Sequence, residues 1–560
     1  MSKERVNWHT IDCRYISEGI GDDYKTWKTA IAGKQASRVF IESPTGSGKT
    51  SFIIDKLLTY AIEERRSIIY ICNRDALKQQ LITSIRESSL NLKEYVHVNK
   101  QVTKFDYPNS NESIYIVNYQ SLLNLENNLF HPLSNIYYIV MDEVHFFLDD
   151  ALYNNNSDKI FWKILYFFNN MVQLFMSATI LDFMNLYTLT YKLFLPSHPQ
   201  PQIYYNIFYE FSIEYYINTY TTPKYNIVLY NNEDFLLKRI SSSQDEKWLI
   251  FTTNLENSNK LRDEIKKHKK CYCINAKSKN TKRWENLTIN KSFDCDVLIS
   301  TKVLDNGVNI IDDKLKNIVL PFMYPTDFIQ MIGRKRFTET SQYVNLYVRR
   351  LTSQEIRSRL MNINNSILKI NAITTANSMR KKISYIKNYW NSKSNSGFDF
   401  KYKEDELQIT FNNFTIFKLC LEFEFYNYLE MSSNNPSAYF YLIRNWLGNN
   451  IKEFENISAY TTLPDFMKNQ VGQPITDTEN FYYNFMELYQ VYCWKFASDN
   501  NMTISANNMM ISAYKSLVRL RQATGRHKAT INECLKKINL PYIINKKNNN
   551  WIVTPIVTEE

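Results

Sequence analysis

Residues 43–50 read Ser-Pro-Thr-Gly-Ser-Gly-Lys-Thr and closely follow the apolar run Val39–Ile41. A glycine-rich segment between a strand and a helix is the setting of a phosphate-binding loop. Gly46 and Gly48 let the backbone curl so that its N–H groups point inward, and the N-terminus of the next helix adds the positive end of a dipole. Because the chain has only 11 glycines, a chance Gly-x-Gly-Lys-Thr after a strand has a probability of roughly 1%. We therefore expect this segment to bind nucleotide phosphates.

The polar residues of the loop have separate expected roles. Lys49 would reach the β- and γ-phosphates, and the hydroxyl of Thr50 would be a ligand of Mg²⁺. The strict pattern has Gly at position 43, where this chain has Ser. The predicted nucleotide-binding residues of the loop are Ser43, Thr45, Gly46, Ser47, Gly48, Lys49 and Thr50.

A second signal is the acidic sequence Asp142-Glu143-Val144-His145, which comes after the apolar run Tyr138–Met141. Carboxylates at the C-terminal end of a strand stand where α/β sheets bind their ligands. Asp142 can hold Mg²⁺ through water, and Glu143 can orient and deprotonate an attacking water. An Asp-Glu pair alone is more often a solvated turn. Its occurrence in the same chain as residues 43–50 favours a catalytic pair.

Apolar runs alternate with longer amphipathic segments over most of the first 350 residues, a rhythm typical of parallel sheets covered by helices on both faces. A proline-rich break at Pro196–Pro201 separates two sets of runs and is interpreted as a linker. After about residue 355 the pattern becomes helical. The expected strands are Val39–Ile41, Ile68–Ile71, Ile114–Val117, Tyr138–Met141, Gln173–Met176, Trp248–Phe251, Cys271–Ile274, Val297–Ser300 and Ile318–Leu320.

Composition sets broad limits on the class of protein. The 560-residue chain has a net charge of +11, which suits a polyanionic partner. Its eight cysteines form no C-x-x-C pair, so neither a zinc site nor a disulfide framework is indicated. The N-terminus lacks a signal-peptide core, and no apolar run approaches the about 20 residues of a membrane helix. We expect a soluble, cytoplasmic protein without a membrane partner.

The order of further short motifs resembles that of the superfamily 2 helicases, the DExD/H-box group. Each motif after the first two is weak alone, and their fixed order over about residues 20–350 carries the resemblance. The segments that resemble motifs Ia, Ib, III, IV, V and VI are Asn73–Leu77, Asn118–Leu122, Ser177–Thr179, Ile250–Asn254, Ser300–Asn309 and Gln330–Arg334, respectively.

The resemblance implies two RecA-like domains in tandem, at residues 1–190 and 191–352, followed by a mainly helical region at 353–560. It also implies ATP as the nucleotide, Mg²⁺ as the metal, and nucleic acid as the partner. Gly307 and Gln330 are expected at the nucleotide. The residues expected to contact nucleic acid are Arg74, Gln120, Thr301 and Asn309.

A second domain that closes on ATP can supply an arginine to the transferring phosphoryl group. The predicted catalytic residues are then Lys49, Glu143, Arg334 and Arg336. Such an arginine contributes roughly 10³–10⁵ in rate in known cases. The family often has its second motif VI arginine three residues after the first, where this chain has Phe337. The Gly-Arg-x-Arg spacing is similar to that of replication and origin-binding DNA helicases of viruses and mobile elements. This spacing leaves both Arg334 and Arg336 as candidates, of which we favour Arg334. The alternative for Arg334, Lys335 and Arg336 together is a solvated basic turn.

Residues 515–554 form a basic end with no family motif. A helical pattern at Ala529–Ile538 precedes two apolar runs, Pro541–Ile544 and Trp551–Val553, which flank a turn at Lys546–Asn550. This order is typical of a winged-helix-like unit. The alternative is an ordinary basic surface on a helical cap. The basic residues are Lys515, Arg519, Arg521, Arg526, Lys528, Lys536, Lys537, Lys546 and Lys547.

The sequence therefore favours an ATP-dependent helicase or translocase. DNA is preferred because of the spacing in motif VI and because the glutamine motif of DEAD-box RNA helicases is not visible near Tyr24–Trp27. The alternatives are an RNA helicase, an ATP-switched nucleic-acid-binding regulator that does not unwind, and a degenerate scaffold, against which Lys49, Asp142 and Glu143 argue. Replication, mobile-element or defence proteins are possible partners. The oligomeric state is not indicated.

Overall fold

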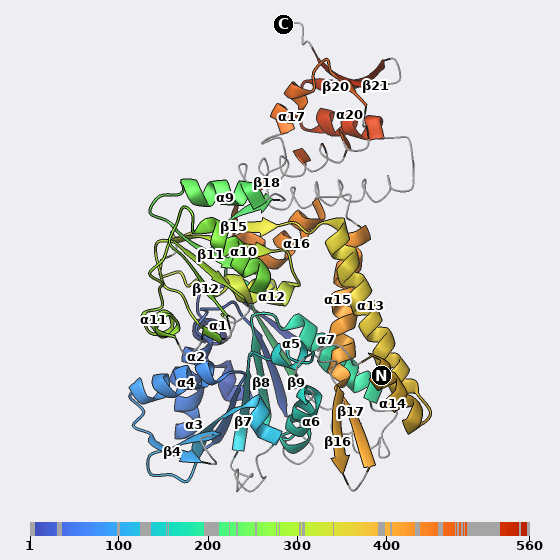
Figure 1. Ribbon diagram of the computed structural model, residues 1–560. Coiled ribbons are helices and arrows are strands. Elements are labelled where there is room, and N and C mark those ends of the chain that lie inside the picture. Colours follow the sequence, from blue (N-terminus) through green and yellow to red (C-terminus); the bar gives the residue numbers. More distant parts are fainter. Residues whose placement is uncertain are drawn as a thin grey trace.

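The computed structural model shows two α/β domains, a pair of long helices beside them and a small C-terminal unit (Figure 1). The structure describes residues 6–30, 36–97, 101–123, 136–152, 154, 156–194, 212–222, 224–230, 233–252, 255–275, 277–278, 281–301, 304, 308–339, 341–389, 398–403, 406–431, 437–456, 463–476, 478, 481–482, 485, 488–489, 527–547 and 550–556.

The first domain is built on a nine-stranded sheet in the order β1-β9-β2-β8-β7-β3-β6-β5-β4. Its strands are parallel except where β5 pairs with β4 and β6. The strands are β1 Val6–Ile11, β2 Ser37–Glu42, β3 Ser67–Cys72, β4 Lys93–His97, β5 Val102–Asp106, β6 Ser113–Asn118, β7 Ile136–Asp142, β8 Val172–Ser177 and β9 Ser212–Asn218.

Helices cover both faces of this sheet, and alternate residues of a strand therefore enter different cores. In β3, Ile69 and Ile71 belong to one core and Ile68 and Tyr70 to the other. The helical segments are α1 Ile16–Ile20, η1 Asp23–Thr26, α2 Lys49–Ser51, η2 Phe52–Leu58, α3 Thr59–Glu63, α4 Asp75–Glu87, η3 Tyr119–Leu123, α5 Phe146–Asp149, α6 Ser157–Phe167 and α7 Leu181–Phe194.

The predicted domain boundary at residue 190 is wrong. Strand β9 lies beyond it, yet β9 pairs with β1 and β2 inside the first sheet. The prediction missed it because polar residues interrupt the apolar ones in Ser212–Asn218, and because Pro196–Pro201 was interpreted as the linker. That proline-rich segment lies outside the described residues. The first domain therefore extends to Asn218.

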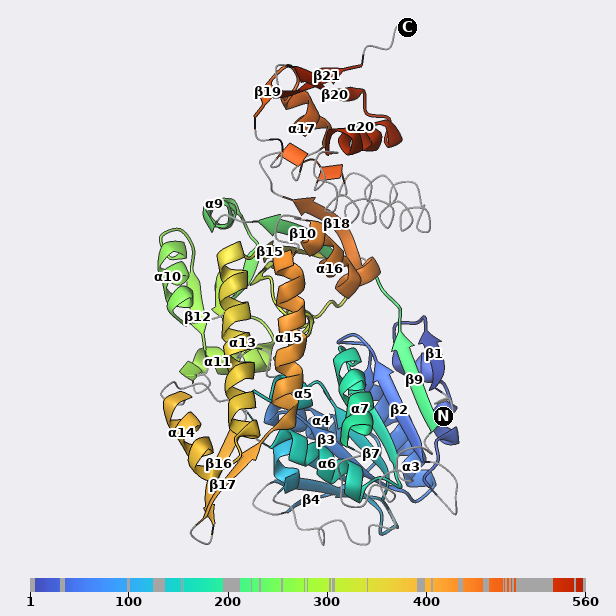
Figure 2. The same ribbon diagram turned by 90° about the vertical axis from the view of Figure 1, so that its right-hand side faces the viewer.

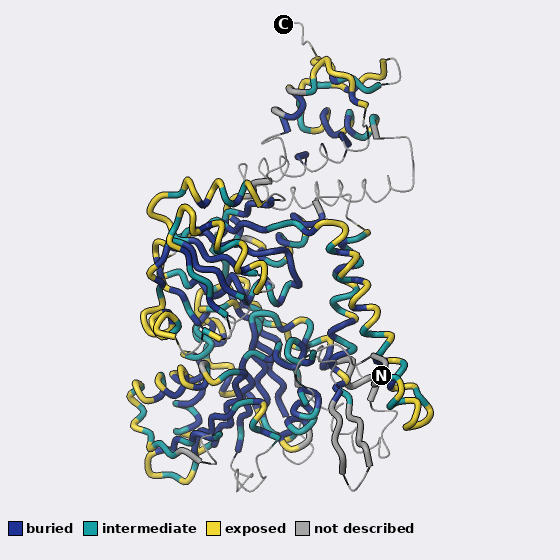
Figure 3. Tube along the Cα trace, viewed as in Figure 1, coloured by how far each residue is buried: buried dark blue, intermediate teal, exposed yellow. Residues whose placement is uncertain are grey.

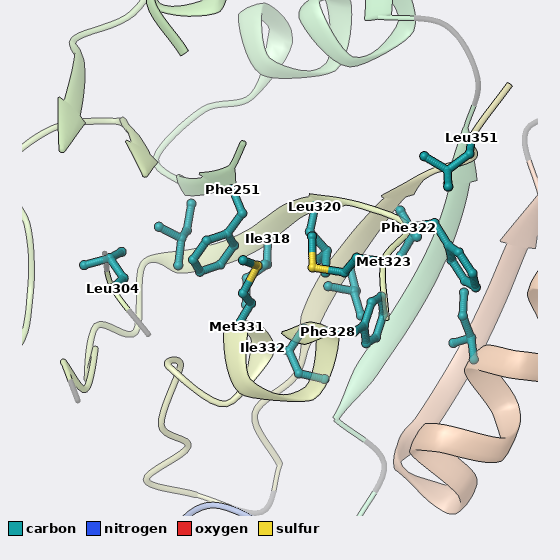
Figure 4. Close-up of a cluster of buried hydrophobic side chains, with 14 of the residues drawn as sticks. Phe251, Leu304, Ile318, Leu320, Phe322, Met323, Phe328, Met331, Ile332 and Leu351 are labelled. Atoms are coloured by element: carbon teal, nitrogen blue, oxygen red, sulfur yellow. The ribbon is translucent and has the colours of Figure 1, made fainter. Parts of the chain in front are cut away.

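The second domain contains a seven-stranded parallel sheet in the order β12-β13-β11-β14-β15-β10-β18. Figure 4 shows part of its core, where Ile318 and Leu320 of one strand lie with Phe328, Met331 and other buried side chains. The elements are β10 Tyr225–Tyr230, α9 Glu233–Ser242, β11 Lys247–Phe251, α10 Leu255–Ile265, β12 Cys271–Ile274, α11 Lys282–Asn290, β13 Val297–Ser300, β14 Leu315–Pro321, α12 Pro325–Ile332, β15 Val344–Arg349 and β18 Ile451–Asn456.

The chain from residue 353 to 456 packs largely against the second domain. Its strand β18 is an edge of the second sheet, and Leu419, Tyr426 and Tyr439 belong to the same core as the sheet residues. Figure 2 shows the two long helices α13 and α15 side by side. The remaining elements are α13 Ser353–Thr375, α14 Met379–Tyr389, β16 Phe398–Lys403, β17 Glu406–Phe411, α15 Asn413–Met431, α16 Ser437–Leu447 and η8 Gly448–Asn450. The sequence pattern did not predict the hairpin β16–β17.

Residues 463–556 contribute a separate small core. A helix packs there against a three-stranded sheet in the order β19-β21-β20, whose pairings are antiparallel. Figure 3 shows its buried positions above those of the two large domains. Within the described residues, no helix has the length and apolar character needed to cross a membrane. The elements are α17 Leu463–Asn469, β19 Pro474–Ile475, α20 His527–Lys537, β20 Tyr542–Lys547 and β21 Asn550–Pro555.

Candidate nucleotide site

The loop predicted to bind phosphate connects β2 to α2. Gly46 and Gly48 have φ angles of 86° and 81°, in the left-handed region that glycine adopts without strain. The hydroxyl of Ser47 donates to the carbonyl of Pro44 at 2.8 Å, which closes the loop on itself. A β-carbon at position 48 would lie 3.3 Å from the ring of Tyr15, so the aromatic side chain packs directly on the loop.

The ammonium of Lys49 is held inside this loop. Its Nζ donates to the carbonyl oxygens of Ser43 at 2.9 Å and Pro44 at 3.2 Å. Burial lowers the pKa of Lys49, while the carboxylates of Glu143 and Asp142 act in the opposite direction. Carbonyl oxygens are weaker partners for an ammonium than phosphate oxygens, and the lysine can therefore exchange these bonds for bonds to a nucleotide.

The two acidic residues stand at the carboxyl end of β7, beside the loop. Asp142 is 8% exposed and accepts a hydrogen bond from the Tyr70 hydroxyl at 2.8 Å. Burial and the neighbouring Glu143 raise the pKa of Asp142. Glu143 has a φ of 53°, a conformation that costs energy for a residue with a side chain and is concentrated at functional sites.

His145 connects the acidic pair with the residues of motif III. Its Nδ1 lies 3.2 Å from Oε2 of Glu143 and 3.1 Å from Oγ of Ser177. Burial alone would raise the pKa of Glu143, but His145, Lys49 and Arg334 lower it. Burial would lower the pKa of His145, and Glu143 outweighs that effect and raises it. Glu143 is therefore an ionised carboxylate oriented by a neighbouring ring.

The second domain contacts the loop through the turn after α12. A β-carbon at Gly333 would lie 2.8 Å from Oγ1 of Thr45, too close for a side chain, so glycine is required for this approach. The next residue, Arg334, is 5% exposed and is held within its own domain. Its Nε donates to the Gln330 carbonyl at 3.0 Å and its Nη2 to Oε1 of Gln330 at 2.8 Å.

Arg336 is placed differently from Arg334. Its Nε donates to Oδ1 of Asn309 at 2.8 Å. Its Nη1 lies 3.4 Å from the position of a β-carbon on Gly46, and this buried nitrogen has no hydrogen-bond partner among the described residues. Burial and then the neighbouring Arg334 lower the pKa of Arg336 to about 10, so its guanidinium stays charged at neutral pH. These contacts favour Arg336 over Arg334, the residue preferred from the sequence.

A cleft of about 250 Å³ opens beside these residues. Its walls come from both domains and from the chain after residue 440. The lining residues include Arg14, Pro44, Thr45, Gly46, Ser47, Gly333, Lys335, Arg336, Phe337, Trp446, Leu447 and Asn450. The cleft therefore joins the phosphate loop to the turn that carries Arg336.

The four residues predicted to contact nucleic acid lie in different surroundings. Gln120 is exposed at the start of η3, and Thr301 is half-buried at the end of β13. Arg74 is paired with Asp150, with Nη2 and Oδ1 3.0 Å apart. The side chain of Asn309 accepts a hydrogen bond from Nε of Arg336 at 2.8 Å. Gly307, predicted at the nucleotide, lies outside the described residues.

The residues present fit Mg²⁺. This ion prefers oxygen ligands and is usually held by one or two carboxylates together with substrate phosphates. Thr50 lies in the helix α2 that follows the loop, and the buried carboxylate of Asp142 lies beside a second carboxylate, Glu143. The unfavourable proximity of two buried acids is what a divalent cation would relieve.

Tyr70, His145 and Tyr15 were not assigned a role from the sequence. Tyr70 belongs to the apolar run Ile68–Ile71 and gives no polar signal there. His145 is part of the acidic motif, so its proximity to Glu143 and Ser177 could have been anticipated from motifs II and III. Tyr15 contacts Gly48 across 33 positions in the chain, which no local pattern indicates.

Two family models match the regions just described. Residues 15–182 match the type III restriction enzyme, res subunit, and residues 231–336 match the helicase conserved C-terminal domain. The chain therefore carries two helicase motor domains in tandem. It is thus an ATP-hydrolysing enzyme that acts on nucleic acid, as the order of motifs predicted. No curated protein sequence matches this helicase.

Solved helicase structures resemble the chain at low sequence identity. S. cerevisiae Dbp5 bound to RNA and ADP BeF3 is 17% identical, with a TM-score of 0.39 over 57% of this chain and 80% of that one. A DEAD box protein from the hyperthermophile Methanococcus jannaschii is 19% identical, with a TM-score of 0.32 over 56% and 82%. The Mycobacterium smegmatis helicase Lhr bound to ssDNA and AMP-PNP is 12% identical, with a TM-score of 0.36 over 60% and 45%.

Proposed function

We propose that this helicase is DNA-directed and couples Mg²⁺-dependent ATP hydrolysis to movement along DNA or to its opening. The observation that carries the motor mechanism is the buried, unpartnered Nη1 of Arg336 beside the phosphate loop, among the residues that the structure describes. A buried nitrogen of a cationic group, left without a partner at the contact between two domains, indicates an anionic ligand. The match of residues 15–182 to a restriction enzyme subunit supports DNA as the nucleic acid.

In this proposal each side chain of the site has one task. Lys49 binds the β- and γ-phosphates, and Glu143 orients the attacking water and takes its proton. His145 holds the carboxylate of Glu143 in place. Arg336, with Arg334 behind it, stabilises the charge that spreads over the transferring phosphoryl oxygens. Thr50 and Asp142 would hold Mg²⁺, which supplies further charge neutralisation when bound.

Comparing nucleic acids as activators of the ATPase tests the choice of DNA. We expect single-stranded or duplex DNA to raise the rate of ATP turnover at least about tenfold, with RNA of the same length and sequence less effective. A larger stimulation by RNA would favour an RNA helicase. Stimulated turnover without strand separation or movement on any substrate would favour an ATP-switched regulator.

We further propose that the basic end at residues 515–554 is a winged-helix-like unit that contacts duplex DNA. Helix α20 is followed by the antiparallel hairpin β20–β21, and the side chain of Asn532 fixes the two together through bonds to the backbone of Ile544 at 2.7 and 3.0 Å. The exposed lysines of the helix end and the hairpin would face the phosphates. They are Lys536, Lys537, Lys546 and Lys547.

Reversing these four lysines to Glu should weaken duplex binding and flatten its salt dependence. The slope of log affinity against log salt is expected to change by about 0.9 for each phosphate that the variant no longer neutralises. The measurement is a salt titration of binding to a fluorescent duplex. The nucleic-acid-independent ATPase should not change, because α20 and β20, which carry the lysines, lie far from α2 and the phosphate loop in Figure 1. An unchanged slope in a folded variant would identify this face as an ordinary solvated surface.

A further inference from the structure

Helix α15 docks on the first motor domain through its N-terminal end, although its sequence follows the second domain. The side chain of Asn412, just before the helix, donates to the carbonyl of Asn154 at 2.6 Å and to Oγ of Ser157 at 2.8 Å. Phe414 is 1% exposed, belongs to a core of the first domain and packs on Phe161 with ring centroids 5.3 Å apart. These buried contacts fix the start of α15 to the first domain.

The C-terminal half of the same helix packs on the second domain. The ring of Phe425 lies 5.5 Å from that of Tyr324 and 5.9 Å from that of Phe322. Leu419, Tyr426 and other residues of the helix belong to the core of the second domain. Helix α15 therefore spans the boundary between the two motor domains, and Figure 2 shows it running from the level of α5 to that of α16.

Lys418 lies at the point where the helix crosses this boundary. Its Nζ is 2.9 Å from Oδ1 of Asp149 in the first domain and 4.2 Å from the ring centroid of Tyr324 in the second. The hydroxyl of Tyr324 in turn donates to Oδ2 of Asp182 at 2.7 Å. A single buried ammonium and a single tyrosine thus connect three parts of the protein: the first domain, the second domain and helix α15.

Both ends of this junction are close in sequence to catalytic groups. Asp149 ends the short helix α5, which begins three residues after Glu143. Tyr324 directly precedes α12, and the turn after α12 carries Arg336. Because α5 and α12 are short, a displacement of Asp149 or Tyr324 at the Lys418 junction would also move Glu143 or Arg336.

We infer that Lys418 is a positioning residue for ATP hydrolysis, which fastens the two motor domains in the closed arrangement that turnover requires. The inference rests on the ATPase activity of this helicase but not on the choice of DNA. It assigns a role in the motor to the chain beyond residue 353, in which the sequence contains no helicase motif.

The electrostatics of the junction agree with a persistent charge on Lys418. Burial alone would lower the pKa of Lys418, but Asp149, Glu422 and Asp327 raise it above its ordinary value. Glu422 lies 3.7 Å from the ammonium on the same helix. Removal of the ammonium would leave these acids close together and partly buried, and their repulsion would favour separation of the domains.

The test compares Lys418→Met, which keeps the length of the side chain, with Lys418→Arg, which keeps its charge. We expect Lys418→Met to lower kcat about tenfold or more, the usual scale for breaking a buried charged pair. The affinity for a non-hydrolysed ATP analogue should change less than threefold, because the phosphate loop is untouched. Lys418→Arg should restore most of the turnover. Lys266→Met, at an exposed lysine of the second domain, is the matched control and should behave as wild type.

Hydrogen exchange of residues 325–332 with the ATP analogue bound gives a second readout. Wild-type and Lys418→Arg proteins should show protection there that Lys418→Met lacks. Full turnover by folded Lys418→Met, or equal losses of turnover in the Met and Arg variants, would overturn the inference. If Lys418→Met does not fold, Tyr324→Phe, which removes only the bond to Asp182, must lower kcat without changing analogue affinity, and an unchanged kcat would reject the inference. If wild type hydrolyses ATP without a response to DNA, the choice of DNA fails while this test still stands.

Discussion

Replacement of Glu143 by Gln is expected to lower steady-state ATP turnover by about 100-fold or more while ATP binding persists, the scale of general-base catalysis. Glutamine keeps the shape of the side chain but cannot take a proton from water. Glu143 is suited to this task because His145 lies 3.2 Å from its carboxylate, and because His145, Lys49 and Arg334 keep its pKa low despite burial. The measurement is steady-state ATP hydrolysis together with binding of a fluorescent nucleotide.

Lys49→Ala is the companion variant, because it removes a contact to the phosphates rather than the base. It should lose turnover and nucleotide affinity together, since its ammonium serves the bound phosphates in the ground state and during transfer. Lys266→Met again controls for loss of a lysine elsewhere. Retention of full steady-state turnover by Glu143→Gln would show that another group deprotonates the water, and the assignment of the acidic pair would then be wrong.

The sequence was sufficient for those strands that are buried on both faces. Continuous apolar runs such as Ile68–Ile71 and Tyr138–Met141 are β3 and β7 in the structure, because a central parallel strand has no solvent-facing side to mark with polar residues. Strand β9 was missed although it lies between β1 and β2 in the sheet. Polar residues interrupt the apolar ones in Ser212–Asn218, and the strand comes after a proline-rich segment, so pattern alone could not assign it to the first sheet.

The candidate site shows the same division between local and long-range information. Residues 43–50 and the acidic pair are each contiguous in sequence. Their expected roles depend on the local turn of the backbone, so the sequence pattern is enough to identify both as candidates. The partners of Arg334 and Arg336 are not local. Gln330 accepts from the guanidinium of Arg334, and Gly46 of the other domain approaches that of Arg336. The sequence alone therefore could not show which of these two arginines faces the phosphate loop.

Arg336→Ala is expected to lower turnover by roughly 10³-fold or more, the scale of arginine fingers in known phosphoryl-transfer enzymes. Its Nη1 is a buried donor without a partner among the described residues, beside Gly46 of the phosphate loop, whereas both donors of Arg334 that face Gln330 are already bonded. A guanidinium nitrogen that gains its partner only with the nucleotide can strengthen its contact as charge develops, which raises kcat rather than affinity.

Arg334→Ala should therefore lose less turnover than Arg336→Ala. Its loss leaves Gln330 without a partner and loosens the end of α12, so part of the effect should be a lower thermal stability. Both variants are compared in single-turnover hydrolysis, nucleotide binding and thermal unfolding. If Arg334→Ala lost more turnover than Arg336→Ala at unchanged stability, Arg334 would be the arginine that contacts the transferring phosphoryl group. If neither variant loses tenfold in turnover, closure of the second domain does not supply an arginine to the phosphates, and the chemistry would rest on the first domain alone.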